Sequence, residues 1–88
     1  MTPAALIFDV DGTLAETEEA HRRAFNETFI EAGLDWHWSV ADYTVLLRTT
    51  GGKERMRAWR ESRGNGPDDA EIAALHKRKT TRYAEIVA

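Results

Sequence analysis

The chain has 88 residues, of which 42% are hydrophobic and 31% are charged, and its formal net charge is −3. This length allows one small domain at most, and the acidic balance argues against nucleic acid as an obligatory partner. The sequence contains no cysteine, which excludes a disulfide framework and a thiolate metal site.

The chain carries no segment that resembles a membrane anchor or a signal peptide. No run approaches the roughly 18 consecutive apolar residues of a membrane span. The first apolar run is not preceded by a basic region, so we expect no signal peptide. We therefore expect a cytoplasmic protein that does not associate with a membrane, and we expect it to be a monomer.

Residues 4–10 form a short apolar run that is interrupted only by Asp9 and is bounded by Pro3 and Gly12. A run of this length between such residues is typical of a strand that is buried on both faces. A buried strand needs neighbours, and the sequence offers no second convincing strand. We therefore expect this strand to belong to a sheet whose other strands lie elsewhere, in a larger α/β enzyme.

Four helices are predicted after Leu14. The first should run from a cap at Thr17 to about Ala32, with Gly33 as its stop. Its apolar stripe should consist of Phe25, Phe29 and Ala32. We assign the three tryptophans of the chain to packing: Trp36, Trp38 and Trp59.

The other three helices are predicted from caps and apolar spacing. Residues 39–42 resemble a capping box and should begin a short helix. A third helix should span residues 53–63, with Met56 and Trp59 on one side. The last should be capped by Asp68 or Asp69 and run to about Val87. Its inward stripe should consist of Ile72, Leu75, Tyr83 and Ile86.

Two carboxylates, Asp9 and Asp11, lie at the carboxyl end of the predicted strand. Their spacing points both side chains toward one side, where open α/β sheets bind ligands. Mg²⁺ prefers such oxygen ligands, and a carboxylate can attack phosphorus while a second one transfers protons. Asp-Gly also commonly marks a simple turn. The apolar strand favours a site, because a buried unpaired carboxylate is costly.

The stretch Phe8-Asp9-Val10-Asp11-Gly12-Thr13-Leu14 resembles the first motif of the haloacid dehalogenase superfamily. The resemblance implies that Asp9 is the nucleophile and a magnesium ligand. It also implies that Asp11 is the general acid/base and binds magnesium through its backbone carbonyl. The implied fold is α/β and HAD-like. Residues 1–14 would be the first strand and catalytic loop of a Rossmann-like core, and residues 15–88 a four-helix cap.

The continuation resembles the β-phosphoglucomutase-like branch, at residues 15–21, Phe25, Lys77-Arg78-Lys79 and Tyr83. The whole chain is similar to CbbY-type phosphatases, which are associated with the Calvin–Benson cycle. This similarity implies a phosphorylated sugar as substrate, namely xylulose 1,5-bisphosphate. The later Ser or Thr, Lys and acidic metal ligands of the family do not occur in these residues. We therefore expect the 88 residues alone to be inactive.

Lys79 and His21 are the first two candidates for binding the substrate. Lys79 falls on the inward stripe of the last helix, where an ammonium group needs an anion or access to solvent. The alternative is a lysine whose amine reaches water at the stripe edge, and the family resemblance favours a substrate-binding lysine. His21 lies one turn before Phe25, on the core side of the first helix. It is either a satisfied, partly buried histidine or, as the resemblance implies, an active-site residue coupled to cap closure.

The remaining candidates lie at the starts of two helices. Glu18 could accept sugar hydroxyls or could be a favourable first-turn charge, and Thr17 beside it completes this end of the predicted site. Gly51, Gly52 and Lys53 form a glycine loop that opens a helix, where backbone N–H groups can hold a phosphate. Glycine pairs are more often plain loops, but in the resembled family this loop helps to specify the substrate. Arg48 and Arg55 flank the loop as secondary candidates.

Three functions remain open on this evidence. The leading one is a Mg²⁺-dependent phosphatase for a sugar bisphosphate, acting through an aspartyl-phosphate. A phosphomutase of the β-phosphoglucomutase type would share both aspartates and the cap. A non-catalytic helical binding module, in which residues 9–13 are only a turn, is the alternative from another class.

Overall fold

The computed structural model describes residues 14–88. These residues form α1 (Glu16–Glu31), α2 (Val40–Leu46), α3 (Gly52–Arg63) and α4 (Asp69–Val87). The four predicted helices are confirmed, and this part of the chain contains no strand. The strand predicted at residues 4–10 lies outside the described residues. None of the helices within 14–88 combines the length and apolarity that crossing a bilayer would require.

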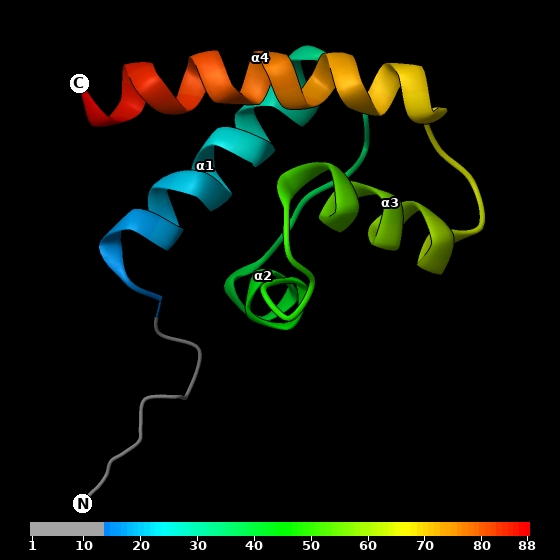
Figure 1. Cartoon of the computed structure of the whole chain (residues 1–88), viewed down its shortest axis with the longest axis horizontal. Helices are drawn as coiled ribbons and strands as arrows, with labels where there is room; N and C mark the ends of the chain where they lie inside the picture. The colour runs from blue at the N-terminus through cyan, green and yellow to red at the C-terminus, as the bar shows by residue number, and fades with distance from the viewer. Residues whose placement is uncertain (1–13) are drawn as a thin grey trace, which may run out of the picture.

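The longest helix, α4, lies across one side of the molecule and packs chiefly against α1 (Figure 1). α3 packs against α4, and α2 packs against α1. The first turns of α1 and the last turns of α4 lie at the same end of the molecule. This arrangement brings side chains from α1, α3 and α4 toward a common interior.

The predicted caps are confirmed for two of the helices. The Ser39 hydroxyl accepts the N–H of Asp42 at 3.0 Å, and the Asp42 carboxylate accepts the N–H of Ser39 at 3.1 Å. Asp68 and Glu71 form the same reciprocal pair at the start of α4. Each pair satisfies backbone donors that the first helical turn leaves unpaired.

The predicted cap at Thr17 is wrong, because α1 begins two residues earlier than a cap there would allow. Ala15 is the N-cap residue and has extended backbone dihedrals. The Glu18 carboxylate accepts the N–H of Ala15 at 3.3 Å. Three acidic residues in the first turn also favour the positive end of the helix dipole. Acidic side chains therefore stabilise this helix start in place of a capping hydroxyl.

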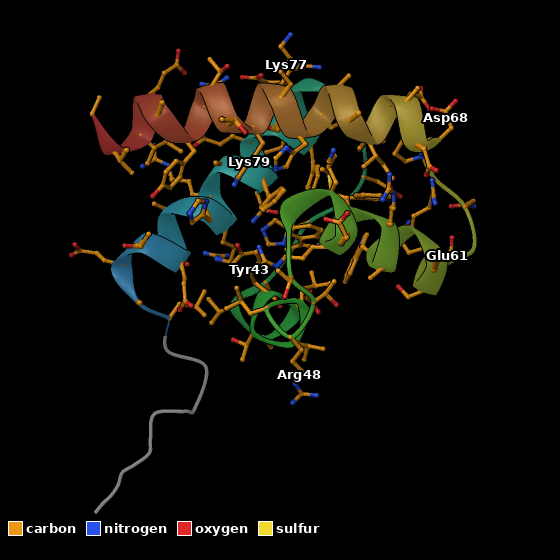
Figure 2. All side chains as sticks on the ribbon, in the orientation of Figure 1. Tyr43, Arg48, Glu61, Asp68, Lys77 and Lys79 are labelled. Atoms are coloured by element: carbon orange, nitrogen blue, oxygen red, sulfur yellow. The ribbon has the colours of Figure 1, made fainter. Side chains whose placement is uncertain are left out.

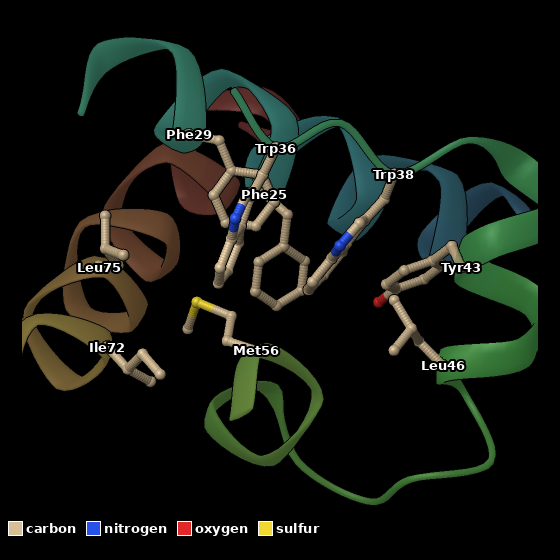
Figure 3. Packing of buried hydrophobic residues seen from close by; sticks show 9 residues of the cluster. All are labelled: Phe25, Phe29, Trp36, Trp38, Tyr43, Leu46, Met56, Ile72 and Leu75. Carbon is tan, nitrogen blue, oxygen red and sulfur yellow. The ribbon is translucent and has the colours of Figure 1, made fainter. Parts of the chain in front are cut away.

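The core joins aromatic residues of α1 and the following loop to aliphatic residues of α4 (Figure 3). Its largest fully buried side chains include Trp38, Tyr43, Phe25 and Phe29. Met56 of α3 also belongs to this cluster, and Figure 3 shows it between α4 and the aromatic rings. The apolar stripe predicted for the first helix is confirmed at Phe25 and Phe29 but is wrong at Ala32, which is exposed. Ala32 is the C-cap residue of α1 and lies beyond the buried helix face.

A buried polar contact holds the loop between α1 and α2 against α1. Asn26 accepts the backbone N–H of Trp38 at 2.8 Å and donates to the Trp38 carbonyl at 3.0 Å. Arg22 donates to the same carbonyl at 2.9 Å. The peptide groups of Trp38 therefore stay satisfied while its indole enters the core. This contact sets the position from which α2 begins.

Substituting Ala for Asn26 should lower the free energy of unfolding by about 2–3 kcal/mol. It leaves the buried N–H of Trp38 without its partner and leaves the Trp38 carbonyl with Arg22 alone. Denaturant unfolding followed by tryptophan fluorescence measures this loss. The control is Asn65→Ala in the exposed α3–α4 loop, for which we expect a change within about 0.5 kcal/mol. Equal losses in the two variants would contradict the structural role of Asn26.

Candidate functional site

Lys79 is a buried cation on the inner side of α4. Only 7% of the residue is exposed, whereas Lys77, two residues earlier, points outward into solvent (Figure 2). Within residues 14–88 no carboxylate forms a salt bridge with Lys79. Its ammonium nitrogen lies 2.9 Å from Nδ1 of His21. Because an ammonium group only donates, Nδ1 must accept, and the neutral imidazole then carries its proton on Nε2.

Aromatic rings surround the same ammonium group. Its nitrogen lies 4.5 Å from the ring centroid of Phe25 and 5.4 Å from that of Tyr83. The Tyr83 ring stacks on the His21 imidazole with centroids 3.9 Å apart. Ring faces attract a cation and partly replace the water that the lysine loses on burial. They supply no net negative charge, so the site remains electropositive.

The pKa values of this cluster follow from burial and like charges. Burial, and to a smaller extent the charge of Arg55, lowers the pKa of Lys79 to about 8. Burial, Lys79 and Arg55 lower the pKa of His21, while Glu18 opposes them. Cationic groups that suppress one another's protonation are stabilised when an anion arrives. The cluster of His21, Arg55 and Lys79 therefore has the chemistry of an anion site.

The glycine loop meets this cluster at the start of α3. Gly51 is the N-cap residue and has φ +95°, a dihedral that side-chain-bearing residues rarely adopt. Gly52 lies against α1 and α4: a β-carbon there would come within 2.6 Å of the His76 ring and 3.2 Å of Phe25. Glycine at position 52 thus lets α3 approach the two helices that carry His21 and Lys79.

The structure brings together part of the predicted substrate-binding set. Lys79 contacts His21, and Gly52 lies beside Phe25, whose ring Lys79 also faces. Glu18 is close enough to affect the pKa of His21. Lys53 is exposed in the first turn of α3.

Thr17, also predicted to bind the substrate, makes no contact with Lys79 or Gly52 among the interactions described above. It is exposed and lines an open groove with Ala20, Tyr83 and Ile86. Asp9 and Asp11, predicted to be catalytic, lie outside the described residues.

The two predicted flanking arginines, Arg48 and Arg55, lie in different surroundings. Arg55 lies over the Tyr43 ring, 5.8 Å from its centroid, and its Nε donates to the Leu46 carbonyl at 3.3 Å. Burial raises the pKa of the Tyr43 phenol, and the nearby Arg55 opposes that rise. Arg48, by contrast, points away from the helices (Figure 2).

His76 is not among the functional residues predicted from the sequence. Its ring lies against Gly52, and burial, Lys79 and Lys53 lower its pKa. The sequence did contain a signal, because His76 lies three residues before Lys79 on the same helix face.

Residues 14–88 contain no group of three or more metal-ligating side chains that could hold an ion. The carboxylates of Asp9 and Asp11 are hard oxygen donors of the kind that Mg²⁺ prefers. The cluster around Lys79 is suited to an anion instead.

Replacing Lys79 with Met should raise the free energy of unfolding by about 1–3 kcal/mol at pH 7, because it removes a buried cation without a counter-charge. Wild-type stability should itself rise between about pH 8 and 10.4, where the unfolded chain binds more protons than the folded one. Lys79→Met should lack that rise. Denaturant unfolding at pH 7 and pH 10 measures both effects, with the exposed Lys77→Met as control. If Lys79→Met were less stable than the wild type while Lys77→Met was unchanged, the proposal that Lys79 is an uncompensated buried charge would be contradicted.

Comparison with known proteins identifies the family of this chain. A family model described as haloacid dehalogenase-like hydrolase matches residues 3–88. Protein CbbY of Rhodobacter capsulatus is 73% identical over 84 residues, which cover 96% of this chain and 37% of that protein. The crystal structure of CbbY from Rhodobacter sphaeroides in complex with phosphate has a TM-score of 0.74 and 52% identity, over 88% of this chain and 34% of that one.

A mutant of the same Rhodobacter sphaeroides CbbY, in complex with xylulose-(1,5)bisphosphate, matches with a TM-score of 0.74, 51% identity and the same coverage. The chain thus spans about a third of the length of these relatives. The predicted HAD-like fold and the predicted similarity to CbbY proteins are confirmed. The chain belongs to the haloacid dehalogenase-like hydrolase family.

Proposed function

We propose that the full-length protein is a Mg²⁺-dependent phosphatase that hydrolyses a sugar bisphosphate, and that residues 15–88 form its cap. The observation that carries this proposal is Lys79, a buried ammonium group without a carboxylate partner in residues 14–88. Such a group is stabilised by an anion, and Arg55 and His21 add charge and hydrogen bonds beside it. A phosphorylated substrate supplies that anion.

The substrate proposed is xylulose 1,5-bisphosphate, with xylulose 5-phosphate as product. The similarity to CbbY, which has been crystallised with this bisphosphate and with phosphate, supports this substrate. A bisphosphate also fits a protein that has two separate places where a phosphate group could bind. The motif at Asp9 and Asp11 would act on one phosphate, while Lys79 and the glycine loop at Gly51–Lys53 would hold the other.

In the proposed reaction, a carboxylate oxygen of Asp9 forms a bond to phosphorus as the bond from phosphorus to the sugar oxygen breaks. Asp11 gives its proton to the departing sugar oxygen, then takes a proton from the water that attacks the aspartyl-phosphate. That attack releases inorganic phosphate and restores Asp9. Asp9 and Asp11 would hold Mg²⁺, which offsets the negative charge of the phosphoryl group when bound.

The cap residues would bind the part of the substrate that does not react. Glu18 and Thr17, at the start of α1, offer oxygen atoms to sugar hydroxyls. His21, held by Lys79 with its proton on Nε2, offers a hydrogen-bond donor. Groups that orient the substrate over Asp9 accelerate the reaction without taking part in bond breaking.

Asp9→Asn should abolish Mg²⁺-dependent release of inorganic phosphate from xylulose 1,5-bisphosphate by the full-length protein, because an amide cannot replace the nucleophilic carboxylate. A colorimetric phosphate assay should show a loss of about 10³-fold or more. Asp35→Asn, in the loop between α1 and α2, is the control and should keep wild-type activity. Equal activity of Asp9→Asn and wild type would eliminate Asp9 as the nucleophile.

The KM for the bisphosphate should rise as the pH passes about 8, because the free protein then loses the proton of Lys79. Lys79→Met should raise KM about tenfold at pH 7, as expected for a lost charge-assisted contact, and should flatten this part of the pH profile. Steady-state kinetics between pH 6.5 and 9 test both effects, with Lys77→Met as control. A profile of the same shape in Lys79→Met would show that another group titrates.

A further inference from the structure

His76 lies near Lys79, beside the cluster of His21, Arg55 and Lys79, and the proposed function gives it no role. It lies on α4, and its ring rests against the first residue of α3. A β-carbon on Gly52 would come within 2.6 Å of both Cδ2 and Nε2 of this ring. The glycine therefore leaves room for the imidazole, which lies at the junction of α3 and α4.

The ring nitrogens of His76 have no hydrogen-bond partner within residues 14–88. The hydrogen bonds of this residue are made by its backbone, whose carbonyl also accepts the Thr80 hydroxyl at 3.0 Å. Neither nitrogen is a fully buried, unsatisfied atom. A half-buried imidazole with accessible, unused nitrogens can donate to a ligand oxygen. His21 differs, because its Nδ1 is already occupied by Lys79.

The charges around His76 come from two helices. Burial lowers the pKa of His76, as do Lys79 on α4 and Lys53 on α3, and Glu54 on α3 opposes them. From α1 the uncharged Phe25 approaches the same glycine. Burial and the neighbouring cations thus both favour the neutral imidazole, and a bound anion would oppose them.

We propose that His76 is a specificity-determining residue, whose ring donates a hydrogen bond to the phosphate that is not hydrolysed and takes up a proton as this phosphate binds. This inference rests on the proposed function and adds a residue to it. It accounts for a ring without partners beside two lysines, and for glycine at position 52. It also predicts discrimination between a bisphosphate and a monophosphate.

The first test compares xylulose 1,5-bisphosphate with xylulose 1-phosphate in the full-length protein. His76→Phe keeps a ring against Gly52 and removes both nitrogens. The ratio of kcat/KM for the bisphosphate to that for the monophosphate should fall about ten- to hundredfold, as expected for a lost hydrogen bond to a charged group. His76→Gln should restore part of the ratio. His37→Phe, in the exposed loop between α1 and α2, is the control and should not change it.

The second test keeps His76 in place and therefore does not depend on the folding of a His76 variant. In the Asp9→Asn protein, NMR titration of the histidine rings should show that the pKa of His76 rises when xylulose 1,5-bisphosphate is added. An unchanged selectivity ratio in His76→Phe, or an unchanged pKa of His76 on binding, would overturn the proposal. Wild-type activity of Asp9→Asn would reject the proposed chemistry alone, because the titration measures His76 directly.

Discussion

The structure depends on how a single buried charge, the ammonium group of Lys79, is accommodated. Removing an ion from water is costly unless other groups replace its hydration. Here that replacement consists of one imidazole nitrogen and two aromatic faces, from His21, Phe25 and Tyr83. These groups lower the cost of burial but leave the charge itself uncompensated. The folded helices would therefore be stabilised by an anion bound next to Lys79.

The outer surface of α4 provides a direct comparison. Arg78 and Arg82 lie on the same helix as Lys79 and form ion pairs with Glu27 and Glu31 of α1. These pairs bridge the two helices where both are open to solvent, and each contributes little by itself. One helix thus has neutralised cations along its outer edge and an unneutralised cation on its inner side. A purely structural lysine would have been better placed among the paired arginines.

Much of the fold could be predicted from local signals, and the failures have a common cause. The caps at Ser39 and Asp68 act within four residues, so their patterns are visible in the sequence. The capping box at Ser39 was predicted correctly, and Asp68 was one of the two caps predicted for the last helix. The cap at Thr17 was wrong because α1 begins at Glu16, where the Glu18 carboxylate accepts the N–H of the N-cap residue Ala15. Ala32 was assigned to the core because the helical period was carried past the last buried turn.

The candidate site was less predictable, because its members come from three helices. Lys79 could be found from its place on an apolar stripe, which is a property of α4 alone. The contact between Lys79 and His21 joins residues 58 positions apart. The close approach of Gly52 to His76 depends on how α3 meets α4. Asp9 and Asp11 were predicted from a local motif and remain predictions.

In the proposed function, the buried charge of Lys79 binds the phosphate that is not hydrolysed. Without substrate, Lys79, His21 and His76 have lowered pKa values because burial and neighbouring cations disfavour their charged forms. A phosphate group bound among them would favour the charged form at all three positions at once. Binding of the non-reacting phosphate would then recover free energy that folding had left unfavourable, and a ligand without that phosphate could not do so. On this view, the selectivity of the cap for a bisphosphate follows from the charge it leaves uncompensated, because only a substrate with a second anionic group completes the electrostatics of the folded helices.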